Sequence, residues 1–358
     1  MREMRRRLLG PLISLLLALA VSALIMLAFH ANPIEAYGAL LIGALGSKQG
    51  LAETLVQMTA FLFAGLGVAI AFRAGLFNIG AEGQLTVGAL CTAIVGAALH
   101  LPWPIEIPLC LLAGAAGGGA WAAIAGVLRA RLGASEVITT IMLNYIAFFF
   151  ANYLVSGPLQ GNVAAPETAL IAASAALPPI VAQTRLTAAF PLAIVVAVAL
   201  AWWLRRTVAG YELRAVGRSE RAARYAGIDV RRVLVRAMTT SGALAGLAGA
   251  TEVLGLFHRF NVQLSPGYGF MSIAVALIGG SDPIGVIFSS FFFGIMQNGA
   301  LSMQALASVP KDLVAIVEGL VILFVAANWL GERLRLRGTA SVIVPGAEEL
   351  PAHGAASP

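Results

Sequence analysis

The stretch GLFNIGAEGQLTVGA, residues 75–89, places Asn78, Glu82 and Gln84 among four glycines and between two long apolar runs. Two roles are open for these polar side chains. In a structural role, Asn78 caps the helix that follows, Glu82 lies in its first turn, where the helix dipole favours negative charge, and the glycines permit a break. In the other role, the break points the three side chains into an internal path for a small polar molecule, as the ends of interrupted helices do in membranes.

A second polar set lies in SEVITTIMLNYIAFFFANYLVSGPL, residues 135–159. Thr140, Asn144, Phe148 and Asn152 recur every four residues and therefore share one broad face of a helix. An amide at membrane depth is costly unless it faces protein or a wet cavity, so Asn144 either lines a path or joins two helices by a hydrogen bond. Phe148 and its aromatic neighbours offer a face for stacking a planar ring, although such runs more often face lipid or core.

The elements that position these residues are membrane helices. The 358 residues are 59% hydrophobic and 11% charged, against about 25% charged in soluble domains, and the mean hydropathy is +0.88. About 20 apolar residues cross a bilayer as a helix, and the alternation typical of a membrane barrel is absent. We therefore expect an all-α polytopic membrane bundle of about ten helices, near 11–30, 54–72, 80–99, 107–128, 138–155, 190–204, 235–256, 268–280, 284–303 and 312–330.

The distribution of basic residues predicts the orientation of the chain. With the N-terminus inside, only four of the 23 Lys and Arg residues fall outside, namely Lys48, Arg185, Arg259 and Lys311. Positive loops face the cytoplasm, so we expect both termini there. One membrane domain then covers residues 1–337, with external stretches at 31–53 and 156–189 and a disordered cytoplasmic tail over 338–358. The window 268–280 is too short to span comfortably and is expected to be a half-helix or a re-entrant piece.

The sequence lacks the motifs of a catalytic site. It contains no GxxxxGK[ST], GxSxG or HExxH pattern, and its four histidines are scattered singly. Cys91 and Cys110 lie in apolar segments and are read as small buried hydrophobes. We expect no metal, no cofactor, no nucleic-acid partner and no enzyme activity; if ATP is used, another subunit hydrolyses it. The glycine-rich runs 114–126 and 241–250 are explained by close helix packing, with Gly242 and Gly246 as a small-xxx-small pair.

The densest polar segment is RRTVAGYELRAVGRSERAARYAGIDVRRVLVR, residues 205–236. Ser219 can cap a short helix in ERAARYAG, with Gly227 as its C-terminal stop and Ile228 as an apolar contact after it. A charged helix of two turns with this ending suits a groove on another protein. The alternative is a basic loop held against anionic lipid headgroups.

A short internal echo joins two distant parts of the chain. FNI at 77–79 follows the second expected helix on the inside, and FNV at 260–262 follows the seventh on the outside. Each leads through glycines into another apolar run. Opposite sidedness is what an inverted repeat of helices 2–5 and 7–10 would give. Glu252 and Glu318 also fall in or near apolar windows, where a carboxylate is either buried for function or close to an interface.

Five blocks together resemble a known family: AGLFNIGAEGQLTVGA, SEVITTIMLNYIA, GRSERAARYAGI, SGALAGLAGA and VALIGGSDPIG. They are similar to the membrane permease subunits of bacterial ABC importers of the branched-chain amino acid, ribose and simple-sugar group, and most similar to the branch for nucleosides and simple sugars. The resemblance covers about residues 55–330, and FNIGAEGQ is its most specific block.

The resemblance implies a fold similar to the vitamin B12 permease and several partners: a second, related permease subunit, a cytoplasmic ATPase, an external substrate-binding lipoprotein and membrane lipid. It also implies that the segment 218–229 is the coupling helix that docks into the ATPase. The positions that match are Arg218, Ser219, Glu220, Arg221, Ala223, Tyr225, Gly227 and Ile228.

The sequence therefore predicts a permease half of an importer in the bacterial cytoplasmic membrane, moving nucleosides or simple sugars by alternating access. Asn78, Glu82, Gln84, Asn144 and Phe148 are its candidate pathway residues. The alternative is an ion-coupled secondary transporter of a small polar solute, with Glu82 or Glu318 as the coupling carboxylate.

Overall fold

The computed structural model describes residues 16–161 and 165–307, together with 313, 316, 319, 320, 323 and 324. Helices are the regular secondary structure of this part, and the only strand-like pairings there are two isolated bridges. The helix expected at 312–330 falls largely outside the described residues. Glu318, the tail 338–358 and both chain termini fall outside them too.

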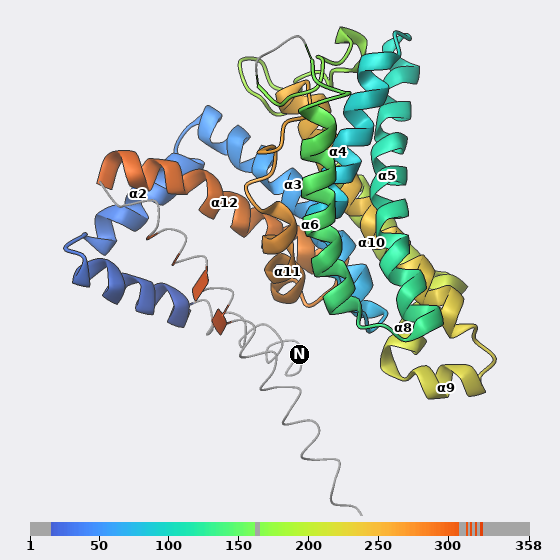
Figure 1. The fold of residues 1–358 in the computed structure, drawn as a ribbon. Coiled ribbons are helices and arrows are strands. Elements are labelled where there is room, and N and C mark those ends of the chain that lie inside the picture. The colour runs from blue at the N-terminus through green and yellow to red at the C-terminus, as the bar shows by residue number, and fades with distance from the viewer. Residues whose placement is uncertain are drawn as a thin grey trace, which may run out of the picture.

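The helices follow one another as shown in Figure 1. A first helix, Leu16–Ala28, precedes α2 and turns from it by 120°. The elements after it are α2 (Pro33–Leu45), α3 (Lys48–Arg73), α4 (Ala81–Ala98), α5 (Trp103–Val127), α6 (Glu136–Val155), α7 (Ala189–Arg206), α8 (Val208–Arg218), α9 (Glu220–Tyr225), α10 (Val230–Glu252), α11 (Tyr268–Ile278) and α12 (Pro283–Ala307). Two π-helical turns, Leu128–Leu132 and Val253–Phe257, extend α5 and α10, and a 3₁₀ turn lies at Ala173–Ala175.

The membrane class expected from composition is confirmed. Among the described residues, seven helices are long and apolar enough to cross a membrane, or up to eight if the bent pair before α3 counts as one span. No helix was expected in the stretch 31–53, and this is wrong, because it contains α2 and the first turn of α3. The overlooked start signal is Asn32, whose side chain caps α2 ahead of Pro33 at its first position.

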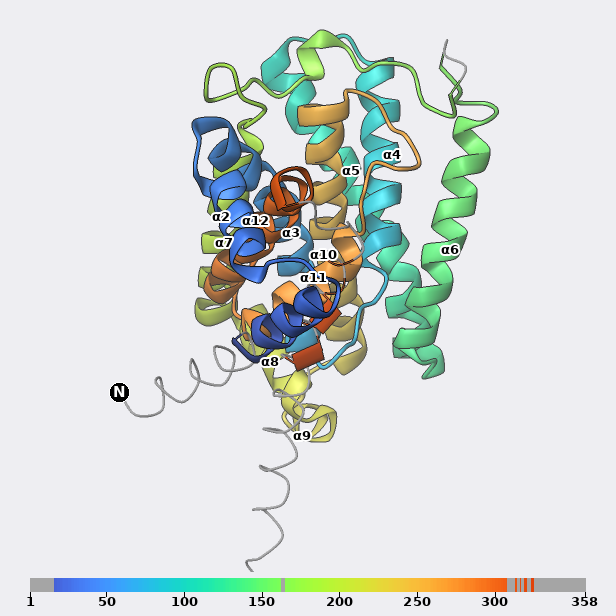
Figure 2. The same ribbon diagram turned by 90° about the vertical axis from the view of Figure 1, so that its left-hand side faces the viewer.

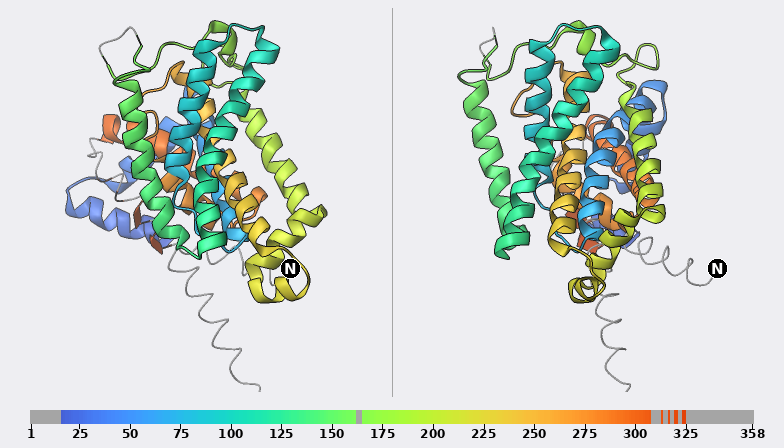
Figure 3. Two further views of the ribbon diagram at one scale, coloured as in Figure 1. Left: turned by 45° about the vertical axis from the view of Figure 1, so that its right-hand side comes forward. Right: turned by 90° about the vertical axis from the view of Figure 1, so that its right-hand side faces the viewer.

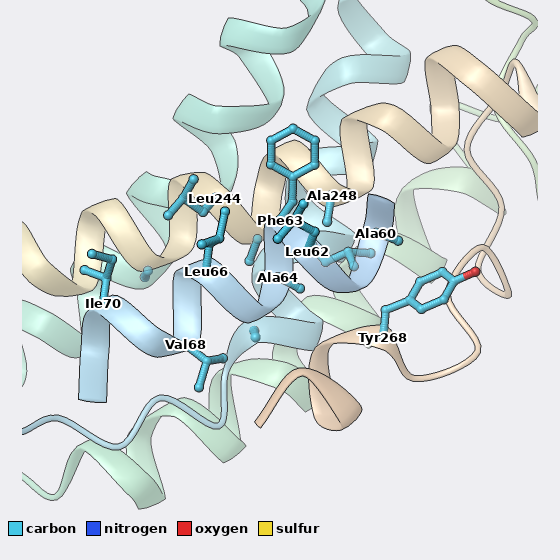
Figure 4. Packing of buried hydrophobic residues seen from close by; sticks show 14 of the residues in the cluster. Ala60, Leu62, Phe63, Ala64, Leu66, Val68, Ile70, Leu244, Ala248 and Tyr268 are labelled. Carbon is cyan, nitrogen blue, oxygen red and sulfur yellow. The ribbon is translucent and has the colours of Figure 1, made fainter. Parts of the chain in front are cut away.

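Helix α3 is the buried centre of the bundle. Every residue from 58 to 71 is buried, because this stretch is apolar or small on all sides and can therefore be surrounded by protein. Figure 4 shows Leu62 and Leu66 of α3 beside Leu244 and Ala248 of α10, with Tyr268 of α11 on another side. This packing fixes α3, α10 and α11 relative to one another.

Glycines let α5 and α10 cross closely, as their spacing predicted. A Cβ added at Gly246 would overlap the Gly114 carbonyl oxygen, and one at Gly242 would overlap the Gly118 carbonyl. Helix α4 joins the same crossing, because Gly88 lies against Gly246. The three helices form a rigid frame at backbone contact (Figure 3).

The bundle has two distinct ends (Figure 2). One, here called the basic end, carries Arg73, the turn Leu128–Leu132 and helices α8 and α9. Here Asp282 binds Arg205 through both carboxylate oxygens at 3.0 Å and lies 3.6 Å from Arg73. The other, the loop end, carries the irregular stretch 156–189, described except for 162–164.

Two passages through the bundle are broken and run in opposite directions. From Arg73 at the basic end, residues 74–80 are irregular and lead to α4, which continues to the loop end, where Ala172 donates to the Gly96 carbonyl at 2.7 Å. From His258 at the loop end, residues 259–267 lead to α11, after which Ser281 accepts a hydrogen bond from Arg73 at 2.8 Å. The window expected to be a half-helix is thus a helix of 11 residues, about half the length of a span.

We predict that Gly246→Ala lowers the melting temperature of the purified protein, whereas Gly38→Ala does not. The added methyl at Gly246 must push α5 and α10 apart, at a cost of about 1–3 kcal/mol. At Gly38, also within a helix, no atom lies within 4 Å of the added Cβ, and the gain in helix propensity favours folding. Thermal unfolding in detergent compares the two, and equal melting temperatures would contradict the backbone contact.

Candidate functional site

The first turns of α4 and α11 meet in the interior of the bundle at Glu82. Its carboxylate is 3% exposed and accepts a hydrogen bond from the Gly269 amide of α11 at 2.6 Å. The Ser265 hydroxyl and the Phe270 amide face the same carboxylate. Both helix N-termini carry partial positive charge, so a single negative charge stabilises the two ends together. Glu82 lies in the first turn of α4, as predicted, but also serves a second helix.

The approach to α4 is fixed by Asn78, which is fully buried. Its amide nitrogen donates to Gln84 and to Ser241 of α10, both at 2.9 Å, and its oxygen accepts from the Gly80 amide at 2.9 Å and from Gln84 at 3.0 Å. Gly80, not Asn78, occupies the cap position of α4. Asn78 and Gln84 therefore use their polar atoms to tie the break to α4 and α10.

Helix α6 holds the same break from the other side. Asn144 accepts from the Gly83 amide at 2.8 Å and donates to the Ile79 carbonyl at 2.9 Å, and Thr140 accepts from the Ile79 amide at 3.3 Å. The buried line of α6 runs through Thr140, Asn144, Ala147, Ala151 and Val155, so Asn152 lies off it and is exposed. The interhelical hydrogen bond expected as one role of Asn144 is thus present.

A cavity of about 310 Å³ opens beside Glu82. Its walls come from α4, α6, α11 and the irregular residues 259–267 before α11. Its polar lining is Glu82, Thr86, Asn261 and Ser265, and its aromatic lining is Phe148, Phe260 and Phe270. Of the five predicted pathway residues, Glu82 and Phe148 line this cavity, whereas Asn78, Gln84 and Asn144 lie behind its wall in the hydrogen-bonded frame of the break.

Residues of the loop end are bonded directly to residues 259–267 of the cavity wall. Thr168 and Phe260 exchange two hydrogen bonds of 3.0 Å, one through the Thr168 side chain, and the Ile171 amide donates to the His258 carbonyl at 2.9 Å. Arg259 and Glu167 form an ion pair of 2.7 Å. A displacement of residues 165–171 would therefore move the wall that contains Phe260 and Asn261.

Helix α9 has the local structure predicted from its sequence. The Ser219 hydroxyl accepts from the Ala222 amide at 3.2 Å, Gly227 adopts a left-handed φ of 80°, and the Ile228 amide donates to the Ala223 carbonyl at 3.0 Å. Ala223 is buried, whereas Tyr225 is 94% exposed. Arg218, Ser219, Arg221 and Gly227 are exposed as well, and Glu220 and Ile228 are partly buried.

An ion-pair chain connects α9 with the cavity wall. Glu220 of α9 lies 3.6 Å from Arg129, which lies 3.3 Å from Glu136, the first residue of α6. Gly217 of α8 is packed against the Arg73 carbonyl at the base of the other broken passage. The exposed basic end thus contacts both α6 and the start of the broken passage that leads to α4.

The sequence prediction missed three of the four polar residues of the cavity lining, Thr86, Asn261 and Ser265. The echo between 77–79 and 260–262 was the available signal for Asn261, because both segments precede a broken-helix start. Ser265 accepts from the amides of Gly267 and Tyr268 at 3.1 and 3.0 Å and so begins α11. No periodic pattern distinguished Thr86 from an ordinary buried threonine.

The chain matches a family of membrane transport proteins. The profile described as branched-chain amino acid transport system / permease component matches residues 50–326. The chain is 43% identical to the guanosine ABC transporter permease protein NupP of Bacillus subtilis (strain 168), over 90% of its own length and 94% of the relative's. It is 37% identical to the nucleoside ABC transporter permease protein NupB of Lactococcus lactis subsp. cremoris, over 93% and 94%. For the glucose ABC transporter permease protein TsgB13 of Haloferax volcanii the identity is 35%, over 91% and 89%.

We predict that Asn144→Leu destabilises the protein, whereas Asn152→Leu on the same helix does not. Leucine at 144 leaves the Gly83 amide and the Ile79 carbonyl without their partner, at a cost of about 1–3 kcal/mol for each buried group. Asn152 is exposed, and its side chain supports no comparable contact. A melting temperature several degrees lower for the first variant alone is expected in detergent. Equal values would show that the Asn144 bonds do not support the break.

Proposed function

We propose that this chain, which belongs to the family of permease components of branched-chain amino acid transport systems, is the permease subunit of an ABC importer that carries nucleosides or simple sugars. The observation that carries the proposal is identity of 35–43% over about nine-tenths of the chain to permeases named for guanosine, nucleosides and glucose. The cavity beside Glu82 supports it, because a small pocket of about 300 Å³ or more with a few polar groups on an apolar wall is typical of ligand sites.

The finer architecture is part of the proposal. We infer about ten spans in an arrangement similar to the vitamin B12 permease, with helices 2–5 and 7–10 as an inverted repeat. The support is the pair of broken passages, which run in opposite directions and meet head to head at Glu82. Transporters with inverted repeats place their substrate site at such broken helices. The candidate pathway is then formed by Glu82 and Phe148 at its surface and by Asn78, Gln84 and Asn144 beneath it.

The proposed orientation follows from charge, and the proposed partners follow from the family. The basic end faces the cytoplasm by the positive-inside rule, with both termini on that side. A separate ATPase docks there on α9, through the coupling positions Arg218, Ser219, Glu220, Arg221, Ala223, Tyr225, Gly227 and Ile228. A second permease subunit and lipid surround the helices, and an external substrate-binding lipoprotein contacts the loop end of this bacterial inner-membrane protein.

Alternating access is driven through the contacts at the basic end. ATP binding closes the partner ATPase and displaces α9, and the Glu220–Arg129–Glu136 chain transmits the displacement to α6. Because Asn144 joins α6 to the first turn of α4, movement of α6 changes the cavity wall beside Glu82. The loop end acts on the opposite wall through Thr168 and Phe260. The cavity is thereby opened to one side at a time.

The function is tested by uptake into proteoliposomes that contain both permeases and the ATPase, with the external lipoprotein added. We expect uptake of radiolabelled guanosine or glucose that requires ATP and stops with a hydrolysis-deficient ATPase. Uptake by the permease chain alone that an uncoupler abolishes would instead establish the ion-coupled alternative. The amount of assembled complex is measured in each preparation, so that loss of a subunit is distinguished from loss of transport.

We predict that Tyr225→Ala releases the ATPase from the complex. Exposed tyrosines that anchor an interface contribute about 2 kcal/mol or more, so affinity falls by roughly 30-fold. Tyr153→Ala is the matched control, because Tyr153 is 69% exposed but lies near the loop-end terminus of α6. Copurification of the ATPase with each variant measures the effect. Retention of the ATPase by Tyr225→Ala would remove this residue from the proposed coupling surface.

A further inference from the structure

The cavity wall contains a buried hydrogen-bond acceptor that the protein leaves unused. The side-chain oxygen of Asn261 is shielded from solvent and has no hydrogen-bond partner among the described residues. A buried polar group without a partner destabilises the protein, and a ligand that supplies a donor removes this cost. The backbone of Asn261 pairs with Glu167 and the adjacent Phe260 is bonded to Thr168, so the residue is held at the wall, and rotation of its side chain presents the oxygen to a ligand.

The charges around the cavity favour an uncharged ligand. Among the described residues Glu82 is the only charged one in the lining, and no Lys, Arg or His of this part contributes to the wall. The partial positive charges of the α4 and α11 N-termini are already matched by this carboxylate. A phosphate or carboxylate of a ligand would therefore find no positive charge left to pair with, and its own negative charge would stay uncompensated beside Glu82 in a site of low dielectric. A hydroxyl group, in contrast, can donate to the wall without this repulsion.

The remaining wall is apolar and aromatic. Phe148 lines the cavity from α6, Phe270 from α11 and Phe260 from the segment 259–267. Leu85 and Leu264 lie beside them. Aromatic side chains contribute large contact areas and favour stacked or edge-on contact with a second ring. The cavity thus pairs a polar side, formed by Glu82, Thr86, Asn261 and Ser265, with an aromatic side.

We infer that this cavity binds the uncharged nucleoside form of the substrate and selects it through Asn261. A sugar hydroxyl donates to the Asn261 side-chain oxygen, the base lies against the phenylalanine rings, and Glu82 excludes nucleotides that carry a phosphate. The inference rests on the proposed function, because it assigns a recognition site within the proposed pathway.

The test compares two ligands on two proteins in the complete reconstituted complex. Initial rates of ATP-dependent uptake are measured for guanosine and for 2′,3′-dideoxyguanosine, with the wild type and with Asn261→Leu. Every preparation contains the same external lipoprotein, so its own preference cancels in the change of the rate ratio. We expect Asn261→Leu to lower guanosine uptake about tenfold relative to dideoxyguanosine, the effect of one lost hydrogen bond. Asn152→Leu, the same exchange away from the cavity, should leave the ratio unchanged.

The outcomes separate failure of this inference from failure of the proposed function. Guanosine uptake by Asn261→Leu with an unchanged ratio overturns the inference and leaves the function intact. Absence of any ATP-driven uptake by the assembled wild-type complex overturns the proposed function, and the inference with it. If the leucine variant does not assemble, Asn261→Ser is used, because its short hydroxyl cannot reach the position of the lost oxygen and the same fall in the ratio is expected.

The exclusion of phosphate is measured separately, without the lipoprotein. Guanosine and guanosine 5′-monophosphate compete with tritiated guanosine for the purified permease–ATPase complex. Glu82→Gln keeps an oxygen that can accept from Gly269 but removes the negative charge. We expect the monophosphate to gain at least about tenfold in affinity relative to guanosine in this variant. An unchanged relative affinity would overturn the role of Glu82 in excluding anions.

Discussion

The hydrogen bond from the Gly269 amide to Glu82 is the contact on which the rest of the site depends. Two helix N-termini point toward each other inside the bundle, where their partial positive charges repel each other. A carboxylate between them neutralises both ends. Without it the two breaks would be unfavourable in a membrane, because backbone groups there must be satisfied by protein.

The site combines a rigid frame with walls that are held by few bonds. The crossing of α4, α5 and α10 is packed at backbone contact and leaves no room for adjustment. In contrast, α6 stands at the edge of the bundle (Figure 2) and is joined to α4 through side chains such as Asn144. The segment 259–267 before α11 is likewise joined to the loop end, through the Phe260–Thr168 hydrogen bond and the Arg259–Glu167 ion pair. Helix α6 and the segment 259–267 are therefore attached to the ends of the bundle, where partners can reach them.

Local features of this fold could be predicted from the sequence, whereas contacts between distant segments could not. Apolar windows located the spans, and the order Ser219, Gly227, Ile228 gave α9 with its cap and its stop, because both signals act within one or two turns. The partner of Glu82 could not be predicted, since the meeting of α4 with α11 depends on how both helices pack against α3. Asn261 was visible only as one member of a three-residue echo.

The short length of α11 has a consequence for how the chain enters the bilayer. Its 11 residues extend about 16 Å, and the irregular residues before it are hydrogen-bonded to protein, as Phe260 is to Thr168, with bonds that lipid cannot supply. The segment 259–278 therefore cannot insert into lipid on its own as an independent transmembrane element. Its backbone has to be satisfied by protein, so α11 is stable in the bilayer only against α3 and α4, the helices on which it packs.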